Sequence, residues 1–199
     1  ALFGTPMAAA LFPMEVISVG IMYYAALVPC VFSAFIGERI SIFMGVRTLT
    51  APYPVEEVPN FYGIAWGKAI LLAICFAFAG ALFCVMLHIF EKQLKKWFQN
   101  PYLRVFVGGV TVVLLWKITG TDTYLGLGGG TIAQSFAESQ KLWVFLLKML
   151  FTCITLCSGF KGGEIVPSLF IGATFGSALA PIFGLPVDIC AACGMVGVF

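Results

Sequence analysis

The sequence is poor in charge and in histidine. Only 10% of its 199 residues are charged, whereas soluble domains carry about 25%, and 61% are hydrophobic. The mean hydropathy of +1.03 predicts an integral membrane protein. The formal net charge of +2 is too small to indicate a nucleic-acid partner.

Metal-ligating and redox side chains are equally scarce. His88 is the single histidine, and Cys190-Ala-Ala-Cys193 lies in an apolar run without a second such pair. A zinc or thioredoxin-like site needs more ligands or a different context. We therefore expect the seven cysteines to be small buried hydrophobic side chains, and we expect no metal and no cofactor.

The two ends of the sequence lack the marks of natural termini. The first residue is Ala1 rather than Met, no charged segment with a cleavage site follows, and the last residue, Phe199, stands in an apolar run. We expect an internal portion of a longer protein without a signal peptide.

Long apolar runs broken by proline and glycine predict an all-α membrane fold. Ala69 to Phe90 carries no formal charge, is the clearest membrane-spanning segment, and is expected to continue into Glu91-Lys-Gln-Leu-Lys-Lys-Trp97. Several other segments are too short to cross a bilayer alone. Helices are expected near 6–16, 18–44, 63–90, 101–119, 131–138, 141–157 and 167–183, and from 188 onward.

Basic residues in the connections predict the orientation. The 91–104 connection holds three lysines and Arg104 against one glutamate, whereas the 38–60 connection has more acidic than basic residues. Positive charge favours the cytoplasmic side, so 91–104 is predicted to be cytoplasmic and the proline-rich loop 46–62 external.

The segment Ser158-Gly-Phe-Lys-Gly-Gly-Glu-Ile-Val-Pro167 is the most informative part of the chain. It places Lys161 and Glu164 in apolar sequence, where a mid-membrane charge costs roughly 2.5–3.5 kcal/mol unless it is offset. Pro167 suits the first turn of a helix, and the N–H groups of Glu164, Ile165 and Val166 would point out of the helix start. Such donors at the positive end of a helix dipole can bind an anion.

A broken helix inside a membrane survives only where it is buried in protein or lines a wet cavity, which favours an ion pathway. The alternative is a kinked helix or re-entrant turn that binds nothing. Glu15 is either a functional acid or a group that faces an aqueous vestibule or caps a neighbouring helix. Lys148 is expected to reach toward the interface or to pair inside the bundle, and Gly126-Leu-Gly-Gly-Gly130 to form an external turn.

These residues resemble the CLC chloride channels and anion/proton antiporters. The stretch from Phe3 to Glu15 is similar to the short helix pair that ends the first half of the family's inverted repeat. The stretch Ser158–Pro167 is similar to the family's Ser-Gly…Gly-x-Phe-x-Pro signature. The resemblance covers essentially the whole chain, as the middle of a helical bundle with broken and re-entrant helices. It implies that 1–45 ends the first repeat half and that 63–199 begins the second.

The resemblance implies an anion site built from backbone. Gly163 takes the place of the signature glycine and Pro167 that of its proline, so the amides of Glu164 and Ile165 would face the anion. Ile165 stands where the signature has phenylalanine. Glu15 resembles the first of two adjacent acids in some antiporters, and Val16 occupies the second position.

The missing second acid and the Phe-Lys-Gly-Gly-Glu variant are similar to the fluoride-handling branch or a related bacterial subgroup. The resemblance therefore implies chloride or fluoride transport, by a channel or a proton-coupled antiporter, in a homodimer in a bacterial plasma membrane. The segments with the gating glutamate and the central tyrosine would lie outside this chain. Lys161 and Glu15 are then candidates for pore or proton-path support.

Two other classes of function are alternatives to anion transport. An intramembrane enzyme would need a nucleophile–base pair or a metal cluster, and the sequence suggests neither. A cation-coupled transporter of small solutes also uses broken helices, but it needs intramembrane acids, in which this chain is poor. It remains the alternative.

Overall fold

The computed structural model describes residues 5–16, 23–45 and 64–199, and it divides the chain into two compact units, Ala1–Tyr53 and Pro54–Phe199. The residues that it describes form helices joined by turns and irregular connections and contain no strand, which confirms the all-α prediction. Four of the helices are long and apolar enough to cross a membrane: Tyr24–Phe43, Trp66–Trp97, Pro101–Thr119 and Ile165–Phe183.

The first unit is a helix pair. A 3-10 turn, η1 (Tyr24–Ala26), leads into α2 (Leu27–Phe43), which packs on α1 (Pro6–Val16). Ala10 and Met14 of α1 are buried, whereas no residue of α2 is. The exposed apolar surface of α2 is the composition expected of a helix that faces lipid.

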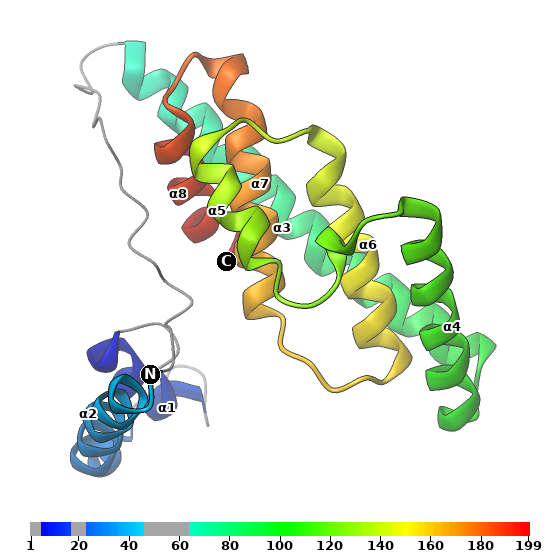
Figure 1. The fold of residues 1–199 in the computed structure, drawn as a ribbon, viewed down its shortest axis with the longest axis horizontal. Helices are drawn as coiled ribbons and strands as arrows, with labels where there is room; N and C mark the ends of the chain where they lie inside the picture. The colour runs from blue at the N-terminus through cyan, green and yellow to red at the C-terminus, as the bar shows by residue number, and fades with distance from the viewer. Residues whose placement is uncertain (1–4, 17–22, 46–63) are drawn as a thin grey trace. The chain divides into compact units, whose positions relative to one another are not determined.

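The second unit is a bundle around one long helix. Figure 1 shows α3 (Ile64–Trp97) running the length of this unit, with α6 (Leu142–Ser158), α7 (Ile165–Phe183) and α8 (Val187–Val198) packed along it. The remaining elements are α4 (Pro101–Thr119), which packs on α6, a 3-10 turn η2 (Asp122–Tyr124), and α5 (Gly129–Ala137), which packs on α7 and α8.

Local sequence sets the ends of α4. The Asn100 side chain accepts a hydrogen bond from the Tyr102 N–H at 3.0 Å, and Pro101 occupies the first helical position. Both are standard helix starts. Gly120 ends the helix in the left-handed region with φ of 65°, where a side chain would be strained.

Small residues bring α7 and α8 together. A side chain at Gly172 would collide with the main chain of Gly194, and one at Gly176 with the main chain of Cys190. In lipid, the association of helices depends on close van der Waals packing, because lipid tails are as apolar as leucine. The glycines therefore permit the backbone contact that holds this pair.

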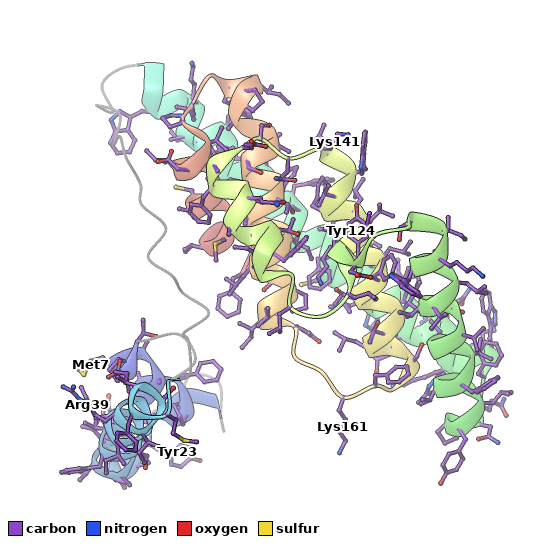
Figure 2. The ribbon with its side chains drawn as sticks, viewed as in Figure 1. Met7, Tyr23, Arg39, Tyr124, Lys141 and Lys161 are labelled. Atoms are coloured by element: carbon purple, nitrogen blue, oxygen red, sulfur yellow. The ribbon has the colours of Figure 1, made fainter. Side chains whose placement is uncertain are left out.

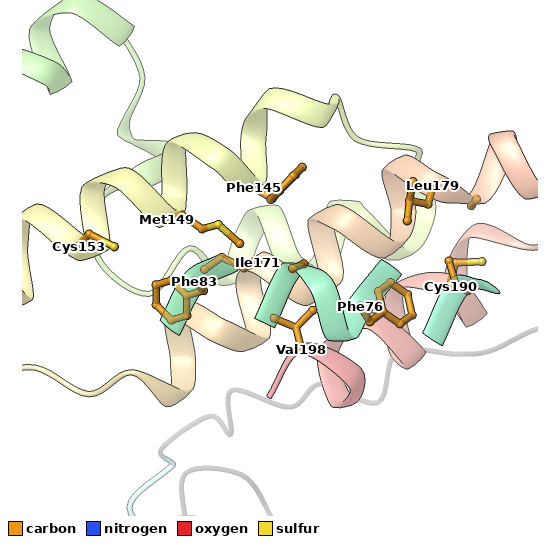
Figure 3. Close-up of a cluster of buried hydrophobic side chains, with 12 residues drawn as sticks. Phe76, Phe83, Phe145, Met149, Cys153, Ile171, Leu179, Cys190 and Val198 are labelled. Carbon is orange, nitrogen blue, oxygen red and sulfur yellow. The ribbon is translucent and has the colours of Figure 1, made fainter. Parts of the chain in front are cut away.

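The core of the second unit is shared by four helices. Figure 3 shows the side chains of α3, α6, α7 and α8 meeting in one cluster. The rings of Phe145 and Phe175 lie 4.5 Å apart between centroids, and Phe76 meets Phe175 edge-on at 6.1 Å. The fully buried members of the cluster are Met149, Cys153, Ile171, Ala180 and Cys190.

The expected helices agree with the observed ones except at some ends. The apolar part of α3 was expected to continue into the lysine-rich segment that ends at Trp97, and the helix does run to Trp97. The segment predicted at 18–44 contains η1 followed by α2 in its described part, and α7 begins at Ile165 rather than at 167. The loop 46–62 lies outside the described residues.

Candidate functional site

The break between α6 and α7 begins at a glycine. Helix α6 ends at Ser158, and Gly159 adopts φ of 106°, in the region that favours glycine. The N–H of Gly159 donates to the carbonyl of Leu156 at 3.0 Å. The chain then runs without regular structure through residues 160–164, so the interruption predicted from the sequence is present.

The first turn of α7 leaves main-chain donors without helical partners. Glu164 is the N-terminal capping residue but makes no side-chain cap bond, and its carbonyl accepts from the N–H of Ser168 at 3.0 Å. Pro167 is the third residue of the helix and has no N–H. Within the described part of the chain, no hydrogen bond occupies the N–H groups of Ile165 and Val166.

These donors lie at an open part of the surface. Gly163 and Glu164 are exposed, Ile165 is 37% exposed, and Val166 and Pro167 are half-buried. A side chain added at Gly163 would meet open space. The residues predicted to face an anion, Gly163 to Pro167, are therefore contiguous and accessible at the positive end of α7.

Lys161 does not neutralise Glu164. Figure 2 shows its side chain projecting from the α6–α7 connection away from the helices, and it is exposed. The ion pair seen among the described side chains joins Lys95 and Glu91 instead. Lys161 and Glu164 form no ion pair, and each is exposed at the connection separately.

The main chain of Glu15 lies in α1, close to the end of that helix. The positions of its side chain and of that of Val16 lie outside the described part of the structure. The role suggested for Glu15 stays a prediction.

A polar hollow adjoins the start of α7. It has a volume of about 280 Å³ and is lined by α3, α4, α6 and the capping residue of α7. Four charged side chains border it: Glu91, Lys95, Arg104 and Glu164. The Nε of Arg104 donates to the Ser158 carbonyl at 3.4 Å, which places a cation at the negative end of α6.

Lys148 is held by main-chain oxygens inside the bundle. Its side chain is 2% exposed, and Nζ donates to the carbonyls of Tyr124 at 3.1 Å and Gly126 at 2.7 Å. It therefore pairs inside the bundle, one of the two outcomes expected, but with neutral oxygens. The Tyr124 ring stacks on Phe151, and burial raises the pKa of its hydroxyl.

A family model for voltage-gated chloride channels matches residues 1–199 of the chain. The chain belongs to the CLC family. This confirms the family suggested by the Ser158–Pro167 segment.

Individual relatives agree with this CLC assignment. A chloride/fluoride channel protein of Pseudomonas syringae pv. tomato is 38% identical over 203 residues, covering 99% of this chain and 44% of that protein. The protein YfeO of Salmonella typhimurium is 31% identical over 207 residues, covering 99% of this chain and 49% of the relative. The chain thus spans about half the length of the curated relatives it matches.

A solved CLC structure has the same fold. The crystal structure of a CLC-type fluoride/proton antiporter matches with a TM-score of 0.88 and 33% identity, covering 100% of this chain and 50% of that one. The predicted membrane bundle with broken helices is therefore a CLC fold, and the chain is part of a multi-pass membrane protein.

Proposed function

We propose that the full-length protein that contains this chain carries chloride or fluoride across a membrane through a CLC-type pore. The anion exchanges part of its hydration for main-chain N–H groups at the start of α7. The observation that carries the proposal is the pair of unoccupied donors at Ile165, which is 37% exposed, and at Val166, which is half-buried, at the positive end of a buried helix.

The surroundings of these donors support an anion rather than a cation. The main-chain donors, the helix dipole and the side chains of Lys95 and Arg104 are positive or partly positive. Around the hollow, Glu91 and Lys95 engage one another at 2.6 Å, and Arg104 faces the same hollow as Glu164, so the excess positive character comes from the main-chain donors and the helix dipole. A cation-coupled solute transporter would instead need several acids and free carbonyl oxygens at this break, and Glu164 is the single acid in residues 159–167.

The relatives named above support fluoride and chloride as the anions to test. They also support either a channel or a proton-coupled antiporter. By the same likeness, we propose a homodimer in a bacterial plasma membrane, with residues 1–45 in the first repeat half, 46–62 as an external loop and 63–199 in the second half. No enzymatic activity is proposed.

The test is anion flux from liposomes that contain the purified full-length protein. Vesicles loaded with potassium fluoride or potassium chloride are diluted into anion-free medium, and efflux is followed with an ion-selective electrode. Empty vesicles serve as the control. A pH indicator in the external medium reports whether protons move against the anion, which separates an antiporter from a channel.

We expect protein-dependent efflux of at least one of the two anions. Solute uptake driven by sodium, with no anion efflux, would overturn the proposal in favour of the cation-coupled alternative. Proton movement coupled to anion efflux would assign the antiporter form, and anion efflux alone the channel form.

A further inference from the structure

Lys148 is a buried cation whose described partners are all neutral. It lies in the middle of α6 with a side chain that is 2% exposed. Its Nζ donates to the carbonyls of Tyr124 and Gly126 and lies 4.8 Å from the centroid of the Phe170 ring. None of the carboxylates that the structure describes forms an ion pair with it.

A lysine is a costly way to bind two carbonyl oxygens. An uncharged amide side chain could donate to the same acceptors, whereas burying an ammonium group in an apolar bundle carries a large desolvation penalty. By this comparison, an uncharged amide in place of Lys148 would make the fold more stable. The presence of a charged side chain here therefore suggests a role other than stability. Because its ligands are neutral carbonyl oxygens, the ammonium group of Lys148 keeps its net positive charge.

The ammonium group of Lys148 lies near the start of α7. Phe170 is the sixth residue of α7, and helical side chains lean toward the N-terminus of their helix. At a rise of 1.5 Å per residue, the ammonium group lies on the order of 10 Å from the free N–H groups of Ile165 and Val166. A charge at that distance adds to the positive end of the α7 dipole.

We propose that Lys148 is an electrostatic positioning residue whose fixed positive charge raises the affinity of the anion site at the start of α7. This inference rests on the proposed function. Two opposite unit charges about 10 Å apart, at an effective dielectric constant of 20, attract strongly enough to change an affinity by about tenfold. The carbonyls of the 124–126 turn hold the ammonium group in place.

Three substitutions separate the charge from its hydrogen bonds. Lys148→Met removes both, Lys148→Gln keeps a donor for the two carbonyls but removes the charge, and Lys148→Arg keeps the charge. Lys141→Met is the matched control, because Lys141 is an exposed lysine that caps the start of the same helix, with its Nζ 5.0 Å from the Trp143 ring centroid. Figure 2 shows Lys141 at the opposite end of α6 from the break.

The measurement is the initial rate of anion efflux from liposomes as a function of anion concentration, with potassium fluoride and potassium chloride as probes. Size-exclusion profiles and melting temperatures report folding. We expect the apparent KM to rise about tenfold in Lys148→Met and Lys148→Gln, with a smaller change in the maximal rate. Lys148→Arg and Lys141→Met should stay near the wild-type KM.

A wild-type KM in Lys148→Gln would assign the residue to the turn alone and overturn the inference. Loss of folding in both neutral variants would assign it to stability and overturn it as well. Absence of anion efflux from the wild-type protein would instead refute the proposed function. An intact function with an unchanged KM in every variant refutes only the role of Lys148.

Discussion

The body and the first turn of α7 face different surroundings. Ile171, Ala173 and Ala180 in the body are fully buried, whereas Glu164 and Ile165 at the start are exposed. The body is fixed by close contact with α8, and the start follows an irregular connection. The difference indicates that a buried helix can position main-chain donors at an open site without help from side chains.

The largest expected effect comes from breaking the packed body. Gly172→Leu would drive a side chain into the main chain of Gly194, which no rotamer change can relieve. Overpacking costs typically 1–3 kcal/mol, and a backbone collision costs more, so we expect loss of folded full-length protein. Size-exclusion chromatography in detergent measures the folded fraction.

Gly130→Ala is the control for this substitution. Gly130 lies in the first turn of α5, and an added methyl group would meet open space. Alanine favours helix by up to about 1 kcal/mol over glycine, so the melting temperature should hold or rise. Equal losses of folded protein in both variants would mean that any replacement of glycine destabilises the fold. The α7–α8 contact would then not explain the effect of Gly172→Leu.

The second-largest effect is expected from a change in the exposed first turn of α7. Replacing Ile165 with its α-hydroxy acid, by nonsense suppression, exchanges the main-chain N–H for an oxygen and keeps the side chain. Hydrogen bonds to charged groups contribute about 1.5–3 kcal/mol, so anion affinity should fall at least about tenfold. Flux against anion concentration in liposomes measures this change.

The control is the same replacement made at Ser168, where an α-hydroxy acid likewise exchanges the main-chain N–H for an ester oxygen. The N–H of Ser168 already donates to the Glu164 carbonyl, so its loss weakens a helical bond and not the site. Anion affinity should then stay near the wild-type value. An unchanged affinity in the Ile165 ester would contradict the assignment of the anion to this amide.

Helix positions were predictable where capping residues mark the ends. Asn100 and Pro101 mark the start of α4, and Gly159 the end of α6, to within a residue. The continuation of α3 beyond Phe90 was expected as well, although apolar length by itself identifies only the part of a helix inside the membrane. A charged turn with a Glu91–Lys95 pair continues the same helix into water.

The helix start that carries the proposed anion site was predictable, but the side chains around it were not. The Gly-Gly-Glu-Ile-Val-Pro pattern indicates a helix start, although α7 begins two residues before the predicted position because proline fits the third place as well. The Gly172-x-x-x-Gly176 spacing is a signal for close helix contact that the sequence analysis missed. The partners of Lys148 are carbonyls far away in the chain, which carry no side-chain signal.

A smaller effect is expected from substitutions in the glycine-rich turn 126–128, which lies against the body of α7. Gly126 and Gly128 both have positive φ, 57° and 66°, but only at Gly128 would a side chain strike the ring of Phe170. The left-handed conformation costs alanine about 1–2 kcal/mol. Gly126→Ala should lower stability by about that amount, and Gly128→Ala by more.

Thermal unfolding of the two variants in one detergent gives the comparison. Equal losses would mean that the Phe170 ring moves aside freely, so that this face of α7 is less rigid than its contact with α8. A larger loss for Gly128→Ala is expected, since the ring is fully buried.

The smallest effect is expected from the exposed charge beside the site. Lys161 extends into solvent and makes no ion pair with Glu164, so its field is screened by salt within about 8–10 Å at physiological ionic strength. Lys161→Gln should change anion flux in liposomes by less than about twofold at 150 mM salt. At 10 mM salt the effect should grow, because the Debye length increases to about 30 Å. A large, salt-independent loss would mean that Lys161 contacts the anion directly, and the backbone would then not be sufficient to form the site.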